Sequence, residues 1–293
     1  MVDLTSRVPG SSWWAQKFMI TWFHLYQAKL LSSVGPSLVV PLSEGKLDLD
    51  LRQMRDVRTY WALRRDGSYE PETTALLGDL LRPGELFVDV GANSGYFTAL
   101  AQSWVRPNGR VVAFEPNPEV FRRLQANVRL NSAEGLVSTR CEAAGEKRSE
   151  GVLRVERFED GWGSLVSGSP SSREFAVQVV SLDGVLPASR AAVVKIDVEG
   201  SELAVIRGMS NFLRSTEDMA VIVEWNRQFA SQQMWEALSN SFSLFQVTRS
   251  DAGRGYGLRS LRAPQDLRRV LNTNLLGIKG PIYASRAGIA TKA

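Results

Sequence analysis

The chain has 293 residues, of which 44% are hydrophobic and 23% are charged, and this composition suits one large α/β domain with additional segments better than two independent domains. The formal net charge is only +4, whereas nucleic-acid binders usually carry a more concentrated basic surface, so we expect no nucleic-acid partner. Cys141 is the single cysteine, which excludes an intrachain disulfide and a four-cysteine zinc site and fits a reducing cytoplasm.

The first 45 residues are predicted to form a separate N-terminal segment. Residues 13–31 combine aromatic and aliphatic side chains with polar ones at helical spacing, which predicts an amphipathic helix. Because polar residues recur at every turn, a transmembrane span is not expected. The helix is expected to pack on the domain or on a second copy of the chain in a homodimer. A membrane-surface helix or a substrate-channel lid is the alternative.

No secretory signal is evident, since Asp3 and Pro9 occupy the first ten residues and no cleavable apolar core follows them. We therefore expect a cytoplasmic protein, with membrane association through residues 13–31 as the variant of that expectation.

The stretch from residue 46 to residue 84 is predicted to cap a ligand site. Residues 46–51 alternate polar and apolar side chains and predict a short strand. A turn is expected at residues 64–67. A helix is expected at 73–81, with Pro71 in its first turn. Glu70 is expected to point at the ligand site from this cap.

Residues 86–95 predict a buried strand, a glycine turn and the start of a helix near Tyr96. Gly91 and Gly95 lack a Cβ, so backbone there can approach a ligand closely. The helix would aim free N–H groups at the same point, where a ligand carboxylate would be well placed. We interpret this stretch as a cofactor cradle.

The spacing within the cradle distinguishes between cofactors. The pattern is Asp89-x-Gly91-x-x-x-Gly95, with Asn93 in the middle, whereas a dinucleotide fingerprint reads Gly-x-Gly-x-x-Gly. It resembles the first motif of class I S-adenosylmethionine-dependent methyltransferases. An ordinary strand-to-helix turn is the alternative.

Alternating strands and helices after the cradle predict a parallel sheet with crossover helices. This methyltransferase-type domain is expected to span residues 46–283, followed by a flexible tail at 284–293. The predicted strands are 110–115, 137–141, 192–197, 219–225, 243–248 and 275–279, the predicted helices are 118–131, 199–213 and 228–239, and an excursion hairpin is predicted from 151–155 and 175–180.

Two acids follow predicted strands beside the cradle. Glu115 comes after four apolar residues, where a carboxylate is costly unless it meets a ligand or partner. The carboxyl ends of adjacent parallel strands line one crevice, so Glu115 is placed to accept both hydroxyls of a ribose. Glu142 would bond an adenine amine by the same geometry. A surface acid at a strand end is the alternative for both.

A second group of polar residues follows the next two strands. Asp197 is predicted at the crevice mouth, and Glu224 at the end of the neighbouring strand, with Glu199 and Asn226 close by. Facing carboxylates suit a general base or the ligands of a hard cation such as Mg²⁺ or Ca²⁺. We predict Asp197 and Glu224 as catalytic residues and Asp197, Glu224 and Asn226 as the candidate metal ligands. The sequence does not separate the base from the metal.

Three stretches together are similar to the FkbM family of methyltransferases: residues 87–96, 114–118 and 195–202. The resemblance covers roughly residues 47–279, and the third stretch is its most specific part. It implies a Rossmann-like, seven-stranded sheet with one antiparallel strand, S-adenosylmethionine as methyl donor, and transfer to a hydroxyl of a sugar, polyketide or lipid-linked metabolite. On the matching positions, it implies that Gly91, Asn93 and Gly95 meet the methionine end, Glu115 the ribose, and Asp197 the reacting region.

Other functions fit the residues less well. The glycine spacing disfavours a nicotinamide dehydrogenase, and residues 196–199 lack the Asn/Asp-Pro-Pro-aromatic motif of base-modifying methyltransferases. His24, the only histidine, lies outside the region of resemblance and is interpreted as a packing residue. A non-catalytic protein that binds S-adenosylmethionine, or one that docks on membranes, is the alternative from another class.

Overall fold

The structure is a computed structural model and describes residues 37–155, 163–164, 173–250, 255–267 and 272–289. The amphipathic segment predicted at residues 13–31 and His24 lie outside the described residues. Within the described ranges, no helix is both long enough and apolar enough to cross a membrane.

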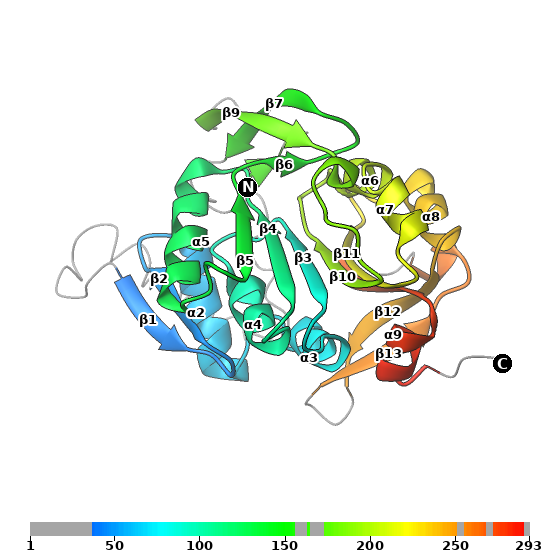
Figure 1. Ribbon diagram of the computed structural model, residues 1–293, viewed down its shortest axis with the longest axis horizontal. Coiled ribbons are helices and arrows are strands. Elements are labelled where there is room, and N and C mark those ends of the chain that lie inside the picture. Colours follow the sequence, from blue (N-terminus) through cyan, green and yellow to red (C-terminus); the bar gives the residue numbers. More distant parts are fainter. Residues whose placement is uncertain (1–36, 156–162, 165–172, 251–254, 268–271, 290–293) are drawn as a thin grey trace.

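A mostly parallel sheet forms the centre of the molecule (Figure 1). Within the described residues it has eight strands, which along the chain are β3 (Leu86–Val90), β4 (Arg110–Phe114), β5 (Val137–Arg140), β10 (Ala191–Ile196), β11 (Asp218–Asn226), β12 (Ser243–Arg249), β13 (Tyr256–Ser260) and β14 (Asn272–Lys279). Their order across the sheet is β13-β12-β14-β11-β10-β3-β4-β5. The strands from β11 to β5 are mutually parallel, and β14 runs antiparallel between β11 and β12.

The predicted α/β architecture is confirmed, but the main sheet has eight strands among the described residues and not the expected seven. The additional strand is β13, which pairs antiparallel with β12 at the edge of the sheet. Its sequence is short and carries only Tyr256 and Leu258 as large apolar residues, so no strand pattern is visible before the pairing partner is known.

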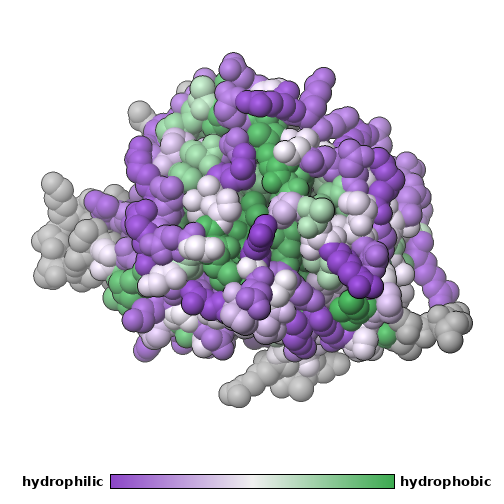
Figure 2. All heavy atoms as spheres, in the orientation of Figure 1, coloured by the Kyte–Doolittle hydropathy of each residue, from purple (hydrophilic) through white to green (hydrophobic). Residues whose placement is uncertain are grey.

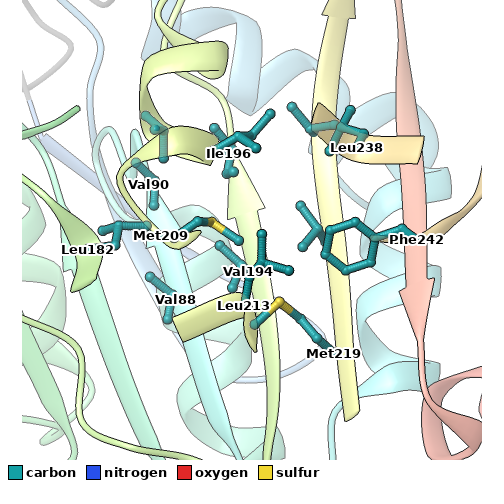
Figure 3. Packing of buried hydrophobic residues seen from close by; sticks show 14 of the residues in the cluster. Val88, Val90, Leu182, Val194, Ile196, Met209, Leu213, Met219, Leu238 and Phe242 are labelled. Carbon is teal, nitrogen blue, oxygen red and sulfur yellow. The ribbon is translucent and has the colours of Figure 1, made fainter. Parts of the chain in front are cut away.

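Helices cover both faces of this sheet. On one face lie α3 (Pro71–Leu80), α4 (Tyr96–Trp104), α5 (Pro118–Leu130) and α9 (Pro281–Arg286), and on the other lie α6 (Glu202–Arg207), α7 (Ser210–Ser215) and α8 (Gln232–Ser239). Figure 3 shows the second interface, where Val194 and Ile196 of β10 pack with Met209 and Leu213. Hydrophilic side chains cover most of the face shown in Figure 2, and apolar ones are visible toward its centre.

One predicted helix and the predicted C-terminal tail differ from the structure in a way that has a clear cause. The helix expected at 199–213 is divided into α6 and α7. The break follows Gly208, where a Cβ would come within 1.9 Å of the Gly145 carbonyl oxygen, so the chain needs glycine there. The predicted tail boundary at residue 284 falls inside α9, where Tyr283 and Ala284 are buried against the sheet.

An N-terminal ribbon packs beside α5. It consists of β1 (Ser37–Pro41) and β2 (Lys46–Asp50), which pair antiparallel and are followed by α2 (Met54–Asp66). Asn131, the residue that follows α5, accepts the Lys46 N–H at 2.8 Å and donates to the Lys46 carbonyl at 2.8 Å. Asn127 bonds the N–H and carbonyl of Asp48 in the same way. The two asparagines, one helical turn apart, thus hold β2 as a neighbouring strand would.

The α2 helix was not among the predicted elements. The predicted turn at residues 64–67 is its C-terminal end, and Gly67 closes it in the left-handed conformation with φ 77°. The helix carries arginines at 55, 58, 64 and 65, so its sequence lacks a strong apolar period.

A second, smaller sheet lies beside the main sheet and at the top of Figure 1. Within the described residues it contains β6 (Ala143–Ala144), β7 (Ser149–Val155), β8 (Gly163–Ser164) and β9 (Arg173–Val180). The antiparallel pairing of β7 with β9 confirms the predicted excursion hairpin. Short 3₁₀ helices follow at Leu182–Gly184 and Pro264–Leu267.

Candidate active site

Polar side chains replace apolar ones where three central strands leave the core. Along β11, Ala220 and Ile222 pack toward α3 and α4, and the next two residues on that face are Glu224 and Asn226, because side chains alternate along a strand. Lys195 of β10 lies directly opposite Asp89 of β3 on the same face. Adjacent strand ends therefore present charged and amide groups to one region.

That region is a cavity of about 1270 Å³. Most of the predicted site residues line it, namely Gly91, Asn93, Glu115, Glu142, Asp197, Glu224 and Asn226. The opposite wall comes from α2 and from the loop before α3, including Tyr69 and Glu70. This volume is large enough for a nucleotide-type cofactor together with a second small molecule.

Position 91 requires glycine because two strand ends approach each other closely there. Its φ is +86°, and a Cβ at this position would lie 1.9 Å from the Asp197 carbonyl oxygen. Glycine is therefore required to bring the cradle turn against the end of β10. The contact places the Asp197 main chain directly beside the cradle.

The main-chain N–H groups of the cradle turn, which precede those of the first turn of α4, make hydrogen bonds within the protein. Gly91 and Ala92 both donate to the Phe114 carbonyl, at 3.0 and 2.8 Å, and Gly95 donates to Ala92. The Asn93 N–H donates to Glu115 Oε2 at 3.0 Å. The turn is thus braced internally, and these four donors are already used.

Two predicted cofactor-binding residues, Asp89 and Gly95, do not line the cavity. Asp89 is buried and accepts a hydrogen bond from Thr98 Oγ1 at 2.7 Å, which ties β3 to the first turn of α4. A Cβ on Gly95 would meet Leu124 Cδ1 at 2.7 Å, so this glycine lets α4 and α5 pack. Both residues support the structure around the cradle without lining the cavity.

Glu115 is a buried carboxylate at the cavity wall, 8% exposed. It accepts N–H groups from Asn93 at 3.0 Å and Asn117 at 2.8 Å, and its oxygens retain further lone pairs. Burial raises the pKa of Glu115 to about 7. Glu142 also lines the cavity, and its carboxylate accepts a hydrogen bond from Arg140 at 2.5 Å.

Asp197, Glu199 and Glu224 form an acid cluster at the other end of the cavity. One carboxylate oxygen from each lies within 4.8 Å of the others. Burial, followed by the charges of Asp197 and Glu199, raises the pKa of Glu224 to about 9. Glu224 Oε2 is buried without a hydrogen-bond partner among the described residues. The cluster therefore suits an incoming cation or hydrogen-bond donor.

Asn226, the third predicted metal ligand, is not part of the acid cluster. Its Oδ1 accepts the Gln228 N–H at 3.0 Å, and its Nδ2 is buried without a partner among the described residues. Glu199 takes the third position in the cluster instead. Its backbone adopts a left-handed conformation with φ 54°, and the following Gly200 donates its N–H to Glu202 at 3.0 Å.

Lys195 is a central residue that the sequence interpretation did not single out. Its side chain is 3% exposed, and Nζ lies 2.9 Å from Asp197 Oδ2 and 4.7 Å from the centre of the Phe97 ring. Burial alone would lower the pKa of Lys195, but the carboxylates of Asp197 and Glu70 outweigh it and raise that pKa. The ion pair fixes Asp197 as an oriented carboxylate.

Glu70 lines the cavity, as expected for the cap. It has a left-handed backbone with φ 45° and accepts a hydrogen bond from Asn274 Nδ2 at 3.3 Å. Among the described residues, four non-glycine residues have positive φ, and three of them, Glu70, Asn93 and Glu199, line this cavity. Backbone strain concentrates at functional sites, which supports this cavity as the active site.

The chain is similar in sequence to known methyltransferases. A sequence model described as the methyltransferase FkbM domain matches residues 89–254. The hexuronic acid methyltransferase AglP of Haloferax volcanii is 28% identical over 67% of this chain and 78% of that protein. The 31-O-demethyl-FK506 methyltransferase FkbM of Streptomyces tacrolimicus is 35% identical over 36% of this chain and 38% of that protein. A crystal structure of methyltransferase FkbM from Methylobacillus flagellatus superposes with a TM-score of 0.43 at 16% identity, covering 76% of this chain and 59% of that one.

Proposed function

Because this chain belongs to the FkbM methyltransferase family and is an S-adenosylmethionine-dependent methyltransferase, we propose that it transfers the methyl group to a hydroxyl oxygen of a small-molecule, sugar, polyketide or lipid-linked acceptor. The observation that carries the proposal is the position of the acid cluster. Its carboxylates lie in the same cavity as the cradle and Glu115.

The residues of the cavity fit the methyl donor. Glu115 is buried, faces the cavity and retains lone pairs for ribose hydroxyls. Glu142 also lines the cavity and is the proposed partner of the adenine amine. When bound, S-adenosylmethionine supplies a methyl group that its sulfonium already activates. The tasks left to the protein are in-line positioning and removal of the acceptor's hydroxyl proton.

Asp197 is the base in this proposal. Its carboxylate is 30% exposed toward the cavity and is held by the Lys195 ammonium at 2.9 Å. Glu224 has a pKa of about 9 because it is buried beside other carboxylates, so it is protonated at neutral pH and serves to orient the acceptor rather than to take its proton. The acid cluster also offers oxygen-only ligands, which would hold Mg²⁺ or Ca²⁺ in preference to zinc.

The names of the relatives support oxygen as the methyl acceptor, since one acts on a hexuronic acid and another on an O-demethylated compound. The experiment that tests the proposal is methyl transfer from labelled S-adenosylmethionine to a panel of sugar, polyketide and lipid hydroxyl compounds by the purified protein. Cofactor binding without transfer to any of them would instead favour the non-catalytic alternative.

Glu115→Gln is expected to weaken binding of S-adenosylmethionine by roughly 1–3 kcal/mol, since a charged acceptor for buried hydroxyls is lost. Wild-type binding should itself tighten as pH rises through about 7, the pKa to which burial raises Glu115. The ionised fraction grows from about one-tenth at pH 6 to about nine-tenths at pH 8, which is roughly a tenfold change in affinity. Isothermal titration calorimetry at both pH values measures the affinity for S-adenosylmethionine.

The matched control for this prediction is Glu119→Gln, a change of an exposed glutamate four residues further on whose side chain is 45% exposed. It should keep both the affinity and its pH dependence. A Glu115→Gln protein that still shows the wild-type pH dependence would contradict the assignment of that dependence to Glu115.

We also propose that residues 13–31 contact membranes peripherally or join two copies of the chain, as their amphipathic sequence indicates. In the membrane case, the full chain sediments with anionic vesicles at low salt and is released by salt, because screening weakens the electrostatic attraction. A chain lacking residues 1–31 should stay in the supernatant. If the full chain does not sediment at low salt, packing on the domain or on a second copy is the remaining account.

A further inference from the structure

β11 and β14 place four polar side chains together at the acid-cluster end of the cavity. Glu224 lies opposite Asn274, and Asn226 lies opposite Asn272, in the antiparallel register of these strands. Side chains directly opposite each other project from the same face of a sheet. All four residues line the cavity, so this strand pair forms a polar surface beside the reacting region.

Asn226 is the unusual member of this surface. It is 7% exposed, yet its Nδ2 has no hydrogen-bond partner among the described residues. Its Oδ1 accepts the Gln228 N–H at 3.0 Å, and since only the oxygen can accept, this bond fixes which end of the amide is the nitrogen. Buried polar groups are nearly always paired in native proteins. Because Asn226 also lines the cavity, its side-chain N–H is available to a molecule bound there.

The chemistry of an atom that pairs with this N–H follows from the donor. An amide N–H pairs only with a hydrogen-bond acceptor, which excludes a metal ion and the cationic sulfonium of the methyl donor. Two residues away on the same face, Glu224 Oε2 is also buried without a partner among the described residues. The two side chains therefore offer a bound molecule two polar contacts along the same face of the sheet.

We propose that Asn226 orients the methyl acceptor by donating from Nδ2 to a second oxygen that lies close to the hydroxyl being methylated. This inference rests on the proposed function and narrows it. The acceptor is polyoxygenated, as a sugar is, because an isolated alcohol on a hydrocarbon would leave the Asn226 N–H unpaired. Asn226 is thus a specificity-determining residue. Its Oδ1 accepts a hydrogen bond from the protein, and its Nδ2 donates one to the acceptor.

The test measures acceptor binding to the complex with S-adenosylhomocysteine by calorimetry. The probes are methyl hexopyranosides, methyl hexuronides, their monodeoxy analogues, and cyclohexanol as the compound with one oxygen. Wild type should bind at least one glycoside and bind cyclohexanol much more weakly. Asn226→Ala and Asn226→Asp should each lower the affinity for that glycoside at least about tenfold. A site built to bond an oxygen discriminates strongly when that hydrogen bond is lost.

One deoxy analogue provides the sharpest comparison. For wild type, removing the oxygen that Asn226 binds should lower the affinity by the same factor as the substitution of Asn226 does. Asn226→Ala should bind this deoxy analogue no more weakly than it binds the parent glycoside. Asn226→Asp retains an oxygen for the Gln228 N–H, so it separates loss of the donor from loss of the loop contact. Asn240→Ala, at an exposed amide at the end of α8, is the matched control and should bind as wild type does.

The outcomes separate this inference from the proposed function. Unchanged glycoside affinity in both Asn226 variants overturns the role of Asn226. If no glycoside binds while S-adenosylmethionine does, the polyoxygenated acceptor is wrong and methyl transfer to another acceptor still stands. If S-adenosylmethionine itself does not bind, the proposed function fails and this inference fails with it.

Discussion

The Asp197→Asn protein is expected to bind S-adenosylmethionine as wild type does but to lose turnover by at least about 100-fold, the usual scale for a missing acid–base group. Asparagine keeps the volume of the side chain and an oxygen for Lys195 Nζ, which lies 2.9 Å from Asp197 Oδ2. The contact of Asp197 with the cradle runs through its main-chain oxygen at Gly91, so the substitution leaves the donor site intact. What it removes is the group that accepts the proton in the proposed function.

Single-turnover methyl transfer and calorimetry on the same preparation measure the two effects separately. A chelator titration of wild type then distinguishes a direct base from a bound cation, because only the cation-dependent version loses activity and regains it with added Mg²⁺ or Ca²⁺. Full activity in the Asp197→Asn protein would contradict both versions.

Gly91→Ala is expected to destabilise the fold by on the order of 4 kcal/mol, at the high end for single substitutions. The added Cβ would lie 1.9 Å from the Asp197 carbonyl oxygen and 2.9 Å from its carbon, and both are main-chain atoms that cannot move aside without shifting β10. The residue also has φ +86°, which alanine adopts only with strain. Denaturant unfolding measures the loss.

Gly84→Ala is the matched control for this substitution. Gly84 has φ +88°, and nothing lies within 4 Å of the position of its Cβ, so alanine there should cost only about 1 kcal/mol of backbone strain. The difference between the two variants isolates the contact with Asp197. Equal losses would show that backbone conformation alone accounts for the need for glycine.

The strand ends that line one side of the cavity could be predicted because each of them is encoded locally. The run before Gly91 is apolar, short and followed by glycine, and Glu115 ends a similar run. Such patterns specify a strand and its end without reference to the rest of the chain. The same reasoning placed Asp197 and Glu224 at neighbouring strand ends, where the structure brings their carboxylates together.

The parts that could not be predicted depend on register and on burial. The sequence interpretation did not single out Lys195, whose burial and position opposite Asp89 depend on how the sheet is assembled. Likewise, the Asn226 amide could be oriented only after its bond to Gln228 was known. The internal use of the cradle N–H groups depends on the Phe114 carbonyl of a neighbouring strand. Local sequence contains none of these distances.

The pairing of β2 with α5 has a consequence for how such a chain can vary. Asn127 bonds the main-chain N–H and carbonyl of Asp48 and also donates to the Ser94 carbonyl in the cradle turn at 2.8 Å. Side-chain amides therefore fix the register of the ribbon relative to the cradle, so that Leu47 and Leu49 point inward. An insertion or deletion within β2 would therefore change which main-chain groups meet Asn127 and Asn131, and the change would reach the cradle turn through Asn127. The side chains of α5 and its C-terminal end thus limit how the length of this strand can vary.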